Sequence, residues 1–162
     1  MPFRQALARG RVGDSGARGF SRTLGALAFL TGAECPMVRR MEPEDPVNVR
    51  GGPLAPCSSK PLTGFFRDGH CNTCQADQGS HTVCAVMTDE FLAYSKYVGN
   101  DLSTARPEFN FTGLKAGDSW CLCAARFLQA HDEGCAPRVN LKATHLRATE
   151  IVPLEILERY KA

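Results

Sequence analysis

Seven of the eight cysteines lie between Asn48 and Ala162, and this density constrains the fold more than any other feature of the sequence. Three states of these thiols are open: disulfides, a metal site, or thiols packed in a core. Disulfides are typical of secreted domains, and the sequence shows no secretory signal, so they are one alternative and not the expected state. Cysteine is also among the most buried residue types, and core packing is the interpretation that best suits Cys84, Cys121 and Cys123.

Residues 1–35 have the composition of an organelle transit peptide, with a disordered leader as the alternative. The first 40 residues carry seven arginines and no lysine against only Asp14 and Glu34, which gives a formal charge of +5. We expect this leader to direct the protein to mitochondria, with a plastid or cytoplasmic location as the alternatives. Its apolar stretch Leu24–Leu30 is far shorter than the ~20 residues that span a bilayer, so we expect no membrane span.

A linker is predicted over residues 36–47, which are rich in proline and acidic residues. The folded domain then occupies residues 48–162. Because the whole chain carries a formal charge of +2 and its first 40 residues carry +5, the remainder carries −3. A nucleic-acid-binding face needs clustered cations. We therefore expect no nucleic-acid partner, and a small molecule or a protein remains as the partner.

Two strand-to-helix units organise the domain. The β-branched, apolar run His81–Met87 predicts a strand, and Thr88 is a good N-cap for a helix that continues to about Val98. Trp120–Cys123 predicts a second strand, and a helix follows it and ends before Gly134.

Shorter elements and two long loops complete the predicted fold. Alternating apolar residues predict a strand over Val139–Thr144, Val47–Arg50 is a candidate first strand, and Pro153 suits the first turn of a final helix. Turn-forming residues dominate 54–80 and 100–117, which predicts ordered but irregular loops. Interleaved strands and helices with such loops favour an α+β fold. We expect a single small domain with long ordered loops, short strands and about three helices.

Several motifs that extend from Asn48 to the last helix are highly specific when taken together. They are Asn48–Gly52, Pro56–Ser58, Thr63–Gly69, Gly79–Leu92, Gly99–Thr104, Gly117–Cys123, Pro137 and Ala143–His145. Through them the chain resembles a small family found in bacteria and some eukaryotes, the domain of unknown function 2237. The resemblance implies a compact α+β domain over about residues 48–162 and implies no activity. Similar sequences tend to have cysteine and glycine where this chain has His70 and Cys74, so Cys74 looks particular to this chain.

Cys71 is the first candidate for a reactive thiol, because a nucleophilic cysteine needs solvent access and a neighbouring imidazole, cation or helix N-terminus. It lies in the first long loop together with Arg67, which is a candidate cation. His81, directly after this loop, is a candidate base. Asp101 is a candidate acid, although a loop aspartate commonly closes its own turn. No phosphate-binding glycine loop or nucleophile elbow occurs. A thiol-dependent enzyme or redox protein is therefore one alternative, and enzymatic activity is left open.

A structural zinc module is the other alternative, and zinc is the one cofactor that the sequence raises. Zinc is held by four thiolates or imidazoles, commonly in two close pairs. Cys71 and Cys74 have the spacing of one pair. The candidates for the second pair are His81 with Cys84 and Cys121 with Cys123. The set Cys71, Cys74, His81 and Cys84 is the metal site that this alternative predicts.

The preferred interpretation is a binding pocket where the two long loops meet, over about residues 57–80 and 100–118. Besides the candidate thiol, base and acid, the side chains expected to line it are Cys57, Arg67, Trp120, Cys121 and His145. His145 also has a competing interpretation, as a histidine bonded to backbone at the end of a strand. We therefore expect a soluble ligand-binding or protein-binding module with a polar pocket of cysteine, histidine and aspartate.

Overall fold

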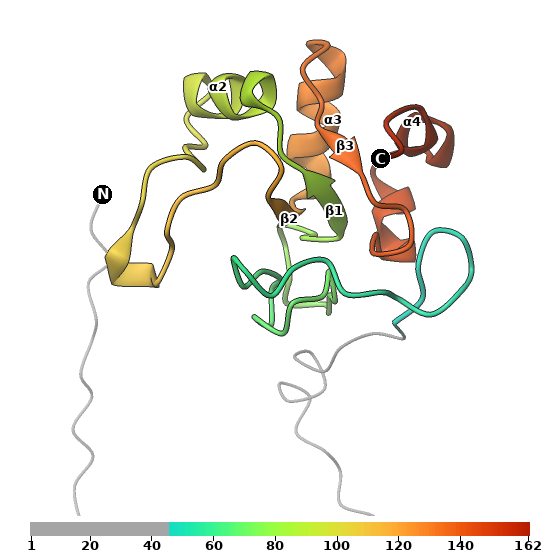
Figure 1. Cartoon of the computed structure of the whole chain (residues 1–162). Coiled ribbons are helices and arrows are strands. Elements are labelled where there is room, and N and C mark those ends of the chain that lie inside the picture. The colour runs from blue at the N-terminus through green and yellow to red at the C-terminus, as the bar shows by residue number, and fades with distance from the viewer. Residues whose placement is uncertain (1–45) are drawn as a thin grey trace, which may run out of the picture. The chain divides into compact units, whose positions relative to one another are not determined.

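The computed structural model describes residues 46–162, which form a small antiparallel sheet with helices and long irregular segments (Figure 1). The central strand is β1 (Val83–Val86), and β2 (Ser119–Leu122) and β3 (Arg138–Val139) pair with its two edges. Both neighbours run antiparallel to β1. The two predicted strands that precede helices are thus confirmed, the first in shortened form and the second shifted by one residue, and they lie side by side.

Three helices and two short 3₁₀ turns accompany the sheet within the described residues. They are α2 (Asp89–Tyr97), η1 (Pro107–Phe109), α3 (Ala124–Asp132), η2 (Leu146–Glu150) and α4 (Leu154–Arg159). The predicted start of α2 is confirmed, because the Thr88 hydroxyl accepts a hydrogen bond from the Phe91 amide at 3.1 Å. The last helix begins one residue later than predicted: Pro153, with ψ 138°, is its N-cap rather than part of its first turn.

The sheet separates two clusters of buried side chains. Val83 and Ala85 of β1 belong to the main core, together with buried residues of α2, α3 and α4. Cys84, between them in sequence, belongs to a second cluster, because successive side chains of a strand point to opposite faces. Figure 1 shows α2 and α3 above the strands and the irregular segment 46–82, cyan to green, below them. The helices thus cover one face, and this segment covers the other.

The predicted strand Val139–Thr144 is wrong beyond its first residue, since β3 ends at Val139. The Asn140 side chain accepts a hydrogen bond from the Lys142 amide at 3.1 Å. The Asn140 carbonyl accepts another from the Ala143 amide, also at 3.1 Å. An asparagine that bonds to its own backbone in this way favours a turn over a strand. The alternating apolar residues that follow therefore belong to a turn.

The candidate first strand Val47–Arg50 is also wrong. Only isolated bridges form there, between Val47 and Pro53 and between Asn48 and His145. The Asn48 side chain accepts a hydrogen bond from the Arg50 amide at 2.8 Å, which turns the chain directly after these bridges. With both corrections made, three short strands, three helices and long ordered loops in the described residues confirm an α+β fold.

The predicted transit peptide or leader, residues 1–35, lies outside the described residues, as does the predicted linker 36–47 except for its last two residues. Among the helices that are described, none has the length and apolar character needed to cross a membrane.

Two fully buried threonines complete the hydrogen bonding of the sheet. Thr63, from the irregular segment, accepts a hydrogen bond from the Cys121 amide on the outer edge of β2 at 2.8 Å. Thr144 accepts one from the Cys84 amide of β1 at 3.1 Å. A buried amide without a partner is costly in free energy. The two hydroxyls therefore replace the carbonyl acceptors that a further strand would otherwise have to supply.

Replacing Thr63 by valine keeps the volume of the side chain but removes the acceptor for the Cys121 amide. We expect Thr63→Val to lower the free energy of unfolding by about 1–3 kcal/mol, because a buried N–H group loses its partner. Thr63→Ser keeps the hydroxyl and serves as the control, with a loss of about 1 kcal/mol for the missing methyl group. Denaturant unfolding followed by circular dichroism measures both. Wild-type stability of Thr63→Val would show that this hydrogen bond contributes nothing.

Candidate functional site

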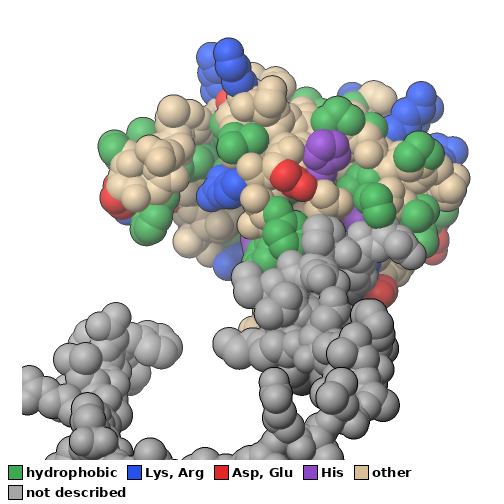
Figure 2. Space-filling view, turned by 90° about the horizontal axis from the view of Figure 1, so that it is seen from below, with side chains coloured by type: hydrophobic (Ala, Val, Ile, Leu, Met, Phe, Trp, Pro, Cys, Tyr) green, Lys and Arg blue, Asp and Glu red, His purple; other side chains and the backbone are tan. Residues whose placement is uncertain are grey.

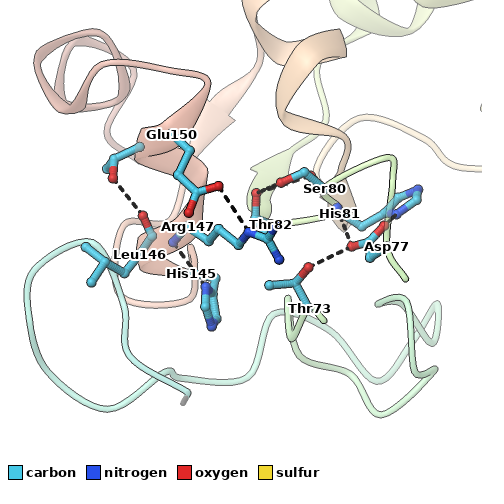
Figure 3. Close-up of polar contacts among 10 residues, drawn as sticks. Thr73, Asp77, Ser80, His81, Thr82, His145, Leu146, Arg147 and Glu150 are labelled. Carbon is cyan, nitrogen blue, oxygen red and sulfur yellow. Dashed lines mark hydrogen bonds and ion pairs between the residues drawn. The ribbon is translucent and has the colours of Figure 1, made fainter. Parts of the chain in front are cut away.

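His81 lies shortly before β1 and is held by a buried carboxylate, that of Asp77. The Asp77 Oδ1 atom accepts a hydrogen bond from His81 Nδ1 at 2.7 Å. Its Oδ2 atom accepts from the His81 amide at 2.8 Å and from the Thr73 hydroxyl at 3.1 Å (Figure 3). The Asp77 side chain is 0% exposed, whereas the His81 side chain is 37% exposed. A carboxylate held in this way fixes the orientation and the tautomer of an imidazole that still reaches solvent.

Cys123 is the residue at which β2 gives way to α3, and its thiol lies beside the His81 ring. It is the N-cap of α3, where the helix offers partial positive charge to an anion. Gly79 shows how little space separates the two groups. A Cβ atom added to Gly79 would lie 3.3 Å from Cys123 Sγ and 2.6 Å from His81 Cε1. Any other residue at this position would therefore force the imidazole to move.

The contact with Cys123 changes the acidity of the imidazole. A side-chain hydrogen bond with Cys123, the electrostatic interaction with Cys123 and the contact with Asp77 together raise the pKa of His81 from 6.5 to about 9, although partial burial opposes this. His81 is therefore positively charged near neutral pH. An imidazolium beside a partly exposed thiol at a helix N-terminus is the setting in which cysteines become nucleophiles.

Cys123 and His81 open into a cavity of about 340 Å³. The lining residues come from four segments of the chain: Gly64–Arg67, His81, Asn100–Leu102 and Trp120–Cys123. The Arg67 guanidinium lies over the Trp120 ring, 5.4 Å from its centre, and the Phe65 ring stacks on His81 at 6.3 Å between centroids. The cavity thus combines aromatic walls, one cation and a thiol–imidazole pair.

Two larger hollows on the described surface have volumes of about 640 Å³ and 760 Å³, but neither is lined by a cysteine or a histidine. Figure 2 shows the lower side of the domain, where hydrophobic side chains lie between polar ones and the Lys and Arg side chains in view are dispersed. Of these three hollows, the cavity at Cys123 is therefore the one that brings a nucleophile and a base together.

The structure does not bring Cys71 to His81. Cys71 is fully buried and forms a disulfide with Cys121, so it offers no free thiol. The interpretation of Cys71 as an accessible loop nucleophile is corrected by this pairing, because a sulfur bonded to another sulfur cannot also act as a thiolate. Cys121, Arg67 and Trp120 line the same cavity as His81.

Asp101 is not among the residues that line the cavity, although its two neighbours are. Its carboxylate accepts hydrogen bonds from the hydroxyl and the amide of both Thr104 and Ser103, and Lys96 Nζ lies 3.3 Å away. The hydrogen bonds from Thr104, followed by those from Ser103, hold the pKa of Asp101 well below its usual range. Asp101 therefore closes its own turn, and a permanently ionised carboxylate is a poor proton donor.

His145 is nearly fully buried and caps η2. Its Nδ1 atom accepts a hydrogen bond from the Arg147 amide at 3.1 Å, and its own amide donates to the Thr82 carbonyl at 2.9 Å. Figure 3 shows it on the far side of Thr82 from His81, next to Arg147 and Glu150. These contacts match the interpretation of His145 as a histidine bonded to backbone.

Four cysteines pair as two disulfides: Cys57 with Cys84, and Cys71 with Cys121. Cys74 is buried but free, and Cys57 does not line the cavity. Among the described residues, the one cluster of potential metal ligands consists of Cys57, Cys71 and Cys121. This finding corrects the predicted zinc site, whose ligands were Cys71, Cys74, His81 and Cys84.

Sequence reasoning missed Asp77 and misplaced Cys123, which it assigned to the core with Cys84 and Cys121. The latter two are buried, but Cys123 is partly exposed because strand alternation ends with β2 and the helix sets its direction. Two signals could have identified the pair. One is an acid four residues before the candidate base, and the other is a cysteine at a strand-to-helix junction.

Comparison with known proteins identifies the family. The family model described as "Uncharacterized protein conserved in bacteria (DUF2237)" matches residues 47–161, so the chain belongs to this family and the resemblance is confirmed. No curated protein matches the chain. Every residue that lines the cavity falls within one of four motifs that carry the resemblance, namely Thr63–Gly69, Gly79–Leu92, Gly99–Thr104 and Gly117–Cys123. The description names no activity, so a function has to be argued from the site.

Titration of His81 by NMR tests the geometry of the pair. We expect an apparent pKa near 9 in the wild type. Cys123→Ser should lower it more than Asp77→Asn does, because contact with Cys123 is the largest cause of the shift. Since the folded pKa is raised, the stabilisation is complete below about pH 6.5 and is lost as pH rises through about 9. A wild-type value near 6.5 would contradict the contact.

Proposed function

We propose that this member of the DUF2237 family is a thiol-dependent enzyme that uses Cys123 as nucleophile, His81 as base and Asp77 to orient the base. One observation carries this proposal. The Cys123 side chain contacts His81, and the His81 side chain contacts Asp77, at the wall of a cavity of about 340 Å³ that Cys123 and His81 line. A nucleophile within reach of a base that a third group orients is the geometry by which such sites are recognised. The predicted binding pocket becomes the substrate pocket of this enzyme.

Each side chain has a defined task in the proposed reaction. Because Nδ1 of His81 donates to Asp77, Nε2 is the ring nitrogen that holds the proton given up by the Cys123 thiol, so the reaction starts from a thiolate–imidazolium pair. The thiolate then attacks an electrophilic carbon, a bond forms between sulfur and that carbon, and the leaving group departs with the proton held by His81. Asp77 holds the ring in this orientation and stabilises the imidazolium through the same hydrogen bond.

The walls of the cavity favour a small substrate with a flat part and a polar oxygen. Trp120 and Phe65 offer ring faces, and the Arg67 guanidinium offers hydrogen-bond donors and a positive charge above the Trp120 ring. The volume suits a small molecule rather than a protein domain. A carbonyl compound that carries an unsaturated or aromatic group fits these requirements.

Alkylation by iodoacetamide near neutral pH tests the nucleophile. We expect Cys123 to react faster than Cys135, which is also partly exposed but whose thiol contacts the Glu133 carbonyl at 3.5 Å instead of an imidazole. His81→Gln should slow the reaction of Cys123 by roughly 10²-fold, the smaller end of the usual contribution of a base, and leave that of Cys135 unchanged. Peptide mapping by mass spectrometry measures both sites in one sample.

Circular dichroism of His81→Gln controls for unfolding in this experiment, and Cys135 is the internal control for reagent and pH. If Cys123 and Cys135 react at the same rate in the folded wild type, the proposal of an activated thiol at Cys123 fails. The cavity would then be a binding pocket without thiol chemistry.

We also propose that residues 1–35 direct the protein to mitochondria, which is supported by their arginine-rich and acid-poor composition. A fusion of residues 1–47 to a fluorescent protein should colocalise with a mitochondrial dye in living cells. Replacing the arginines of the first 22 residues by glutamine should leave the fusion in the cytosol. Plastid or cytosolic fluorescence of the unaltered fusion would contradict a mitochondrial address.

A further inference from the structure

Four cysteines from two parts of the chain converge below the sheet. Cys84 of β1 and Cys121 of β2 are register partners in the antiparallel ladder, and Cys57 and Cys71 reach them from the irregular segment. The amides of Cys84 and Cys121 donate outward, to threonine hydroxyls rather than to each other. They therefore form a non-hydrogen-bonded pair, the type in which facing side chains lie closer together.

Three sulfur atoms of this four-cysteine cluster lie close enough to bind one ion, and the fourth is bonded to one of them. The Sγ atoms of Cys57, Cys71 and Cys121 all lie within 4.8 Å of one another, and the Sγ atom of Cys84 is bonded to that of Cys57. In a tetrahedral zinc site with Zn–S bonds of about 2.3 Å, neighbouring sulfurs are about 3.8 Å apart. Once both disulfides are reduced, moving the Cys84 sulfur into the group formed by the other three would complete such a site.

The surroundings of the cluster determine which ion it selects. Cys71, Cys84 and Cys121 are each at most 1% exposed, and they pack with Ala143 and Ala55. The ligand atoms are all thiols, which favour zinc and other thiophilic ions over magnesium and calcium. The backbone beside two of the ligands is already fixed by buried threonines, so little order has to be gained when an ion binds.

We propose that the reduced chain binds one thiophilic divalent ion, such as Zn²⁺, through Cys57, Cys71, Cys84 and Cys121, and that the two disulfides are the oxidised form of the same site. A dithiol reductant gives two electrons and two protons to each disulfide and becomes a disulfide itself. The four thiols then release four protons as their thiolates bind the ion. A disulfide oxidant reverses both steps and releases the ion.

This site is distinct from the proposed catalytic residues. Cys123 and His81 are not members of the cluster, although Cys121 lies two residues before Cys123 and lines the same cavity. Metal binding and thiol reactivity can therefore be separated by single substitutions, and the failure of one proposal leaves the other standing.

Cobalt titration of the full-length chain tests the proposal. The protein is reduced with a phosphine, freed of reductant under nitrogen and titrated with Co²⁺. We expect one Co²⁺ per chain, with the intense sulfur-to-cobalt charge-transfer absorption of a tetrahedral thiolate site, and its loss when Zn²⁺ displaces the cobalt. The oxidised chain should show no such absorption, because its sulfurs are bonded to one another.

Matched variants identify the ligands. Cys57→Ser and Cys121→Ser should lose the spectrum of four thiolates, whereas Cys74→Ser, Cys123→Ser and Cys135→Ser should retain it. Reduced wild type that takes up no stoichiometric cobalt would overturn the proposal, as would loss of the spectrum in Cys74→Ser. The wild-type titration decides the matter even where a serine variant fails to fold. Retention in Cys123→Ser shows that the metal site does not depend on the proposed nucleophile.

Discussion

The attachment of the irregular segment to β1 and β2 is the constraint on which the domain depends. Residues 46–82 contain no helix and no strand longer than an isolated bridge, so regular hydrogen bonding cannot hold them in place. The bonds Cys57–Cys84 and Cys71–Cys121 span 27 and 50 residues, and by loop-closure entropy each is worth roughly 3–4 kcal/mol in the form described. The Thr63 hydroxyl adds a directed contact to the edge of β2. Side-chain bonds, and not backbone hydrogen bonding between strands, therefore hold this segment against the face of the sheet.

The same attachment assembles the candidate site. The segment ends beside α3, where the Ser80 carbonyl accepts a hydrogen bond from the Ala124 amide at 2.9 Å. This bond places His81 next to Cys123, the residue before Ala124. Ser80 adopts φ 46°, a left-handed conformation that is uncommon for a residue with a side chain. Strain of this kind is kept where the surroundings enforce it, and here it lies between Gly79 and His81, at the base of the thiol–imidazole pair.

The helices could be predicted from sequence because their signals are local, whereas the site could not. Thr88 and the acidic residues after it mark the start of α2, and Gly134 follows the end of α3. The pairing of Cys71 with Cys121 instead joins residues 50 apart, and nothing in their local sequence specifies it. The failed strand after Val139 shows a third case, in which an asparagine side chain outweighs an apolar alternation.

Cys121 belongs to both of the sites that we propose. It lines the cavity together with Cys123, so two free thiols there would compete for the same imidazole as proton acceptor. In the structure the Cys121 sulfur is bonded to Cys71, and in the metal-bound form that we propose it would be bonded to the ion. In neither form is Cys121 nucleophilic, because a reactive thiolate is bonded neither to another sulfur nor to a metal ion. In both of these states Cys123 is therefore the one available thiol among the residues that line the cavity.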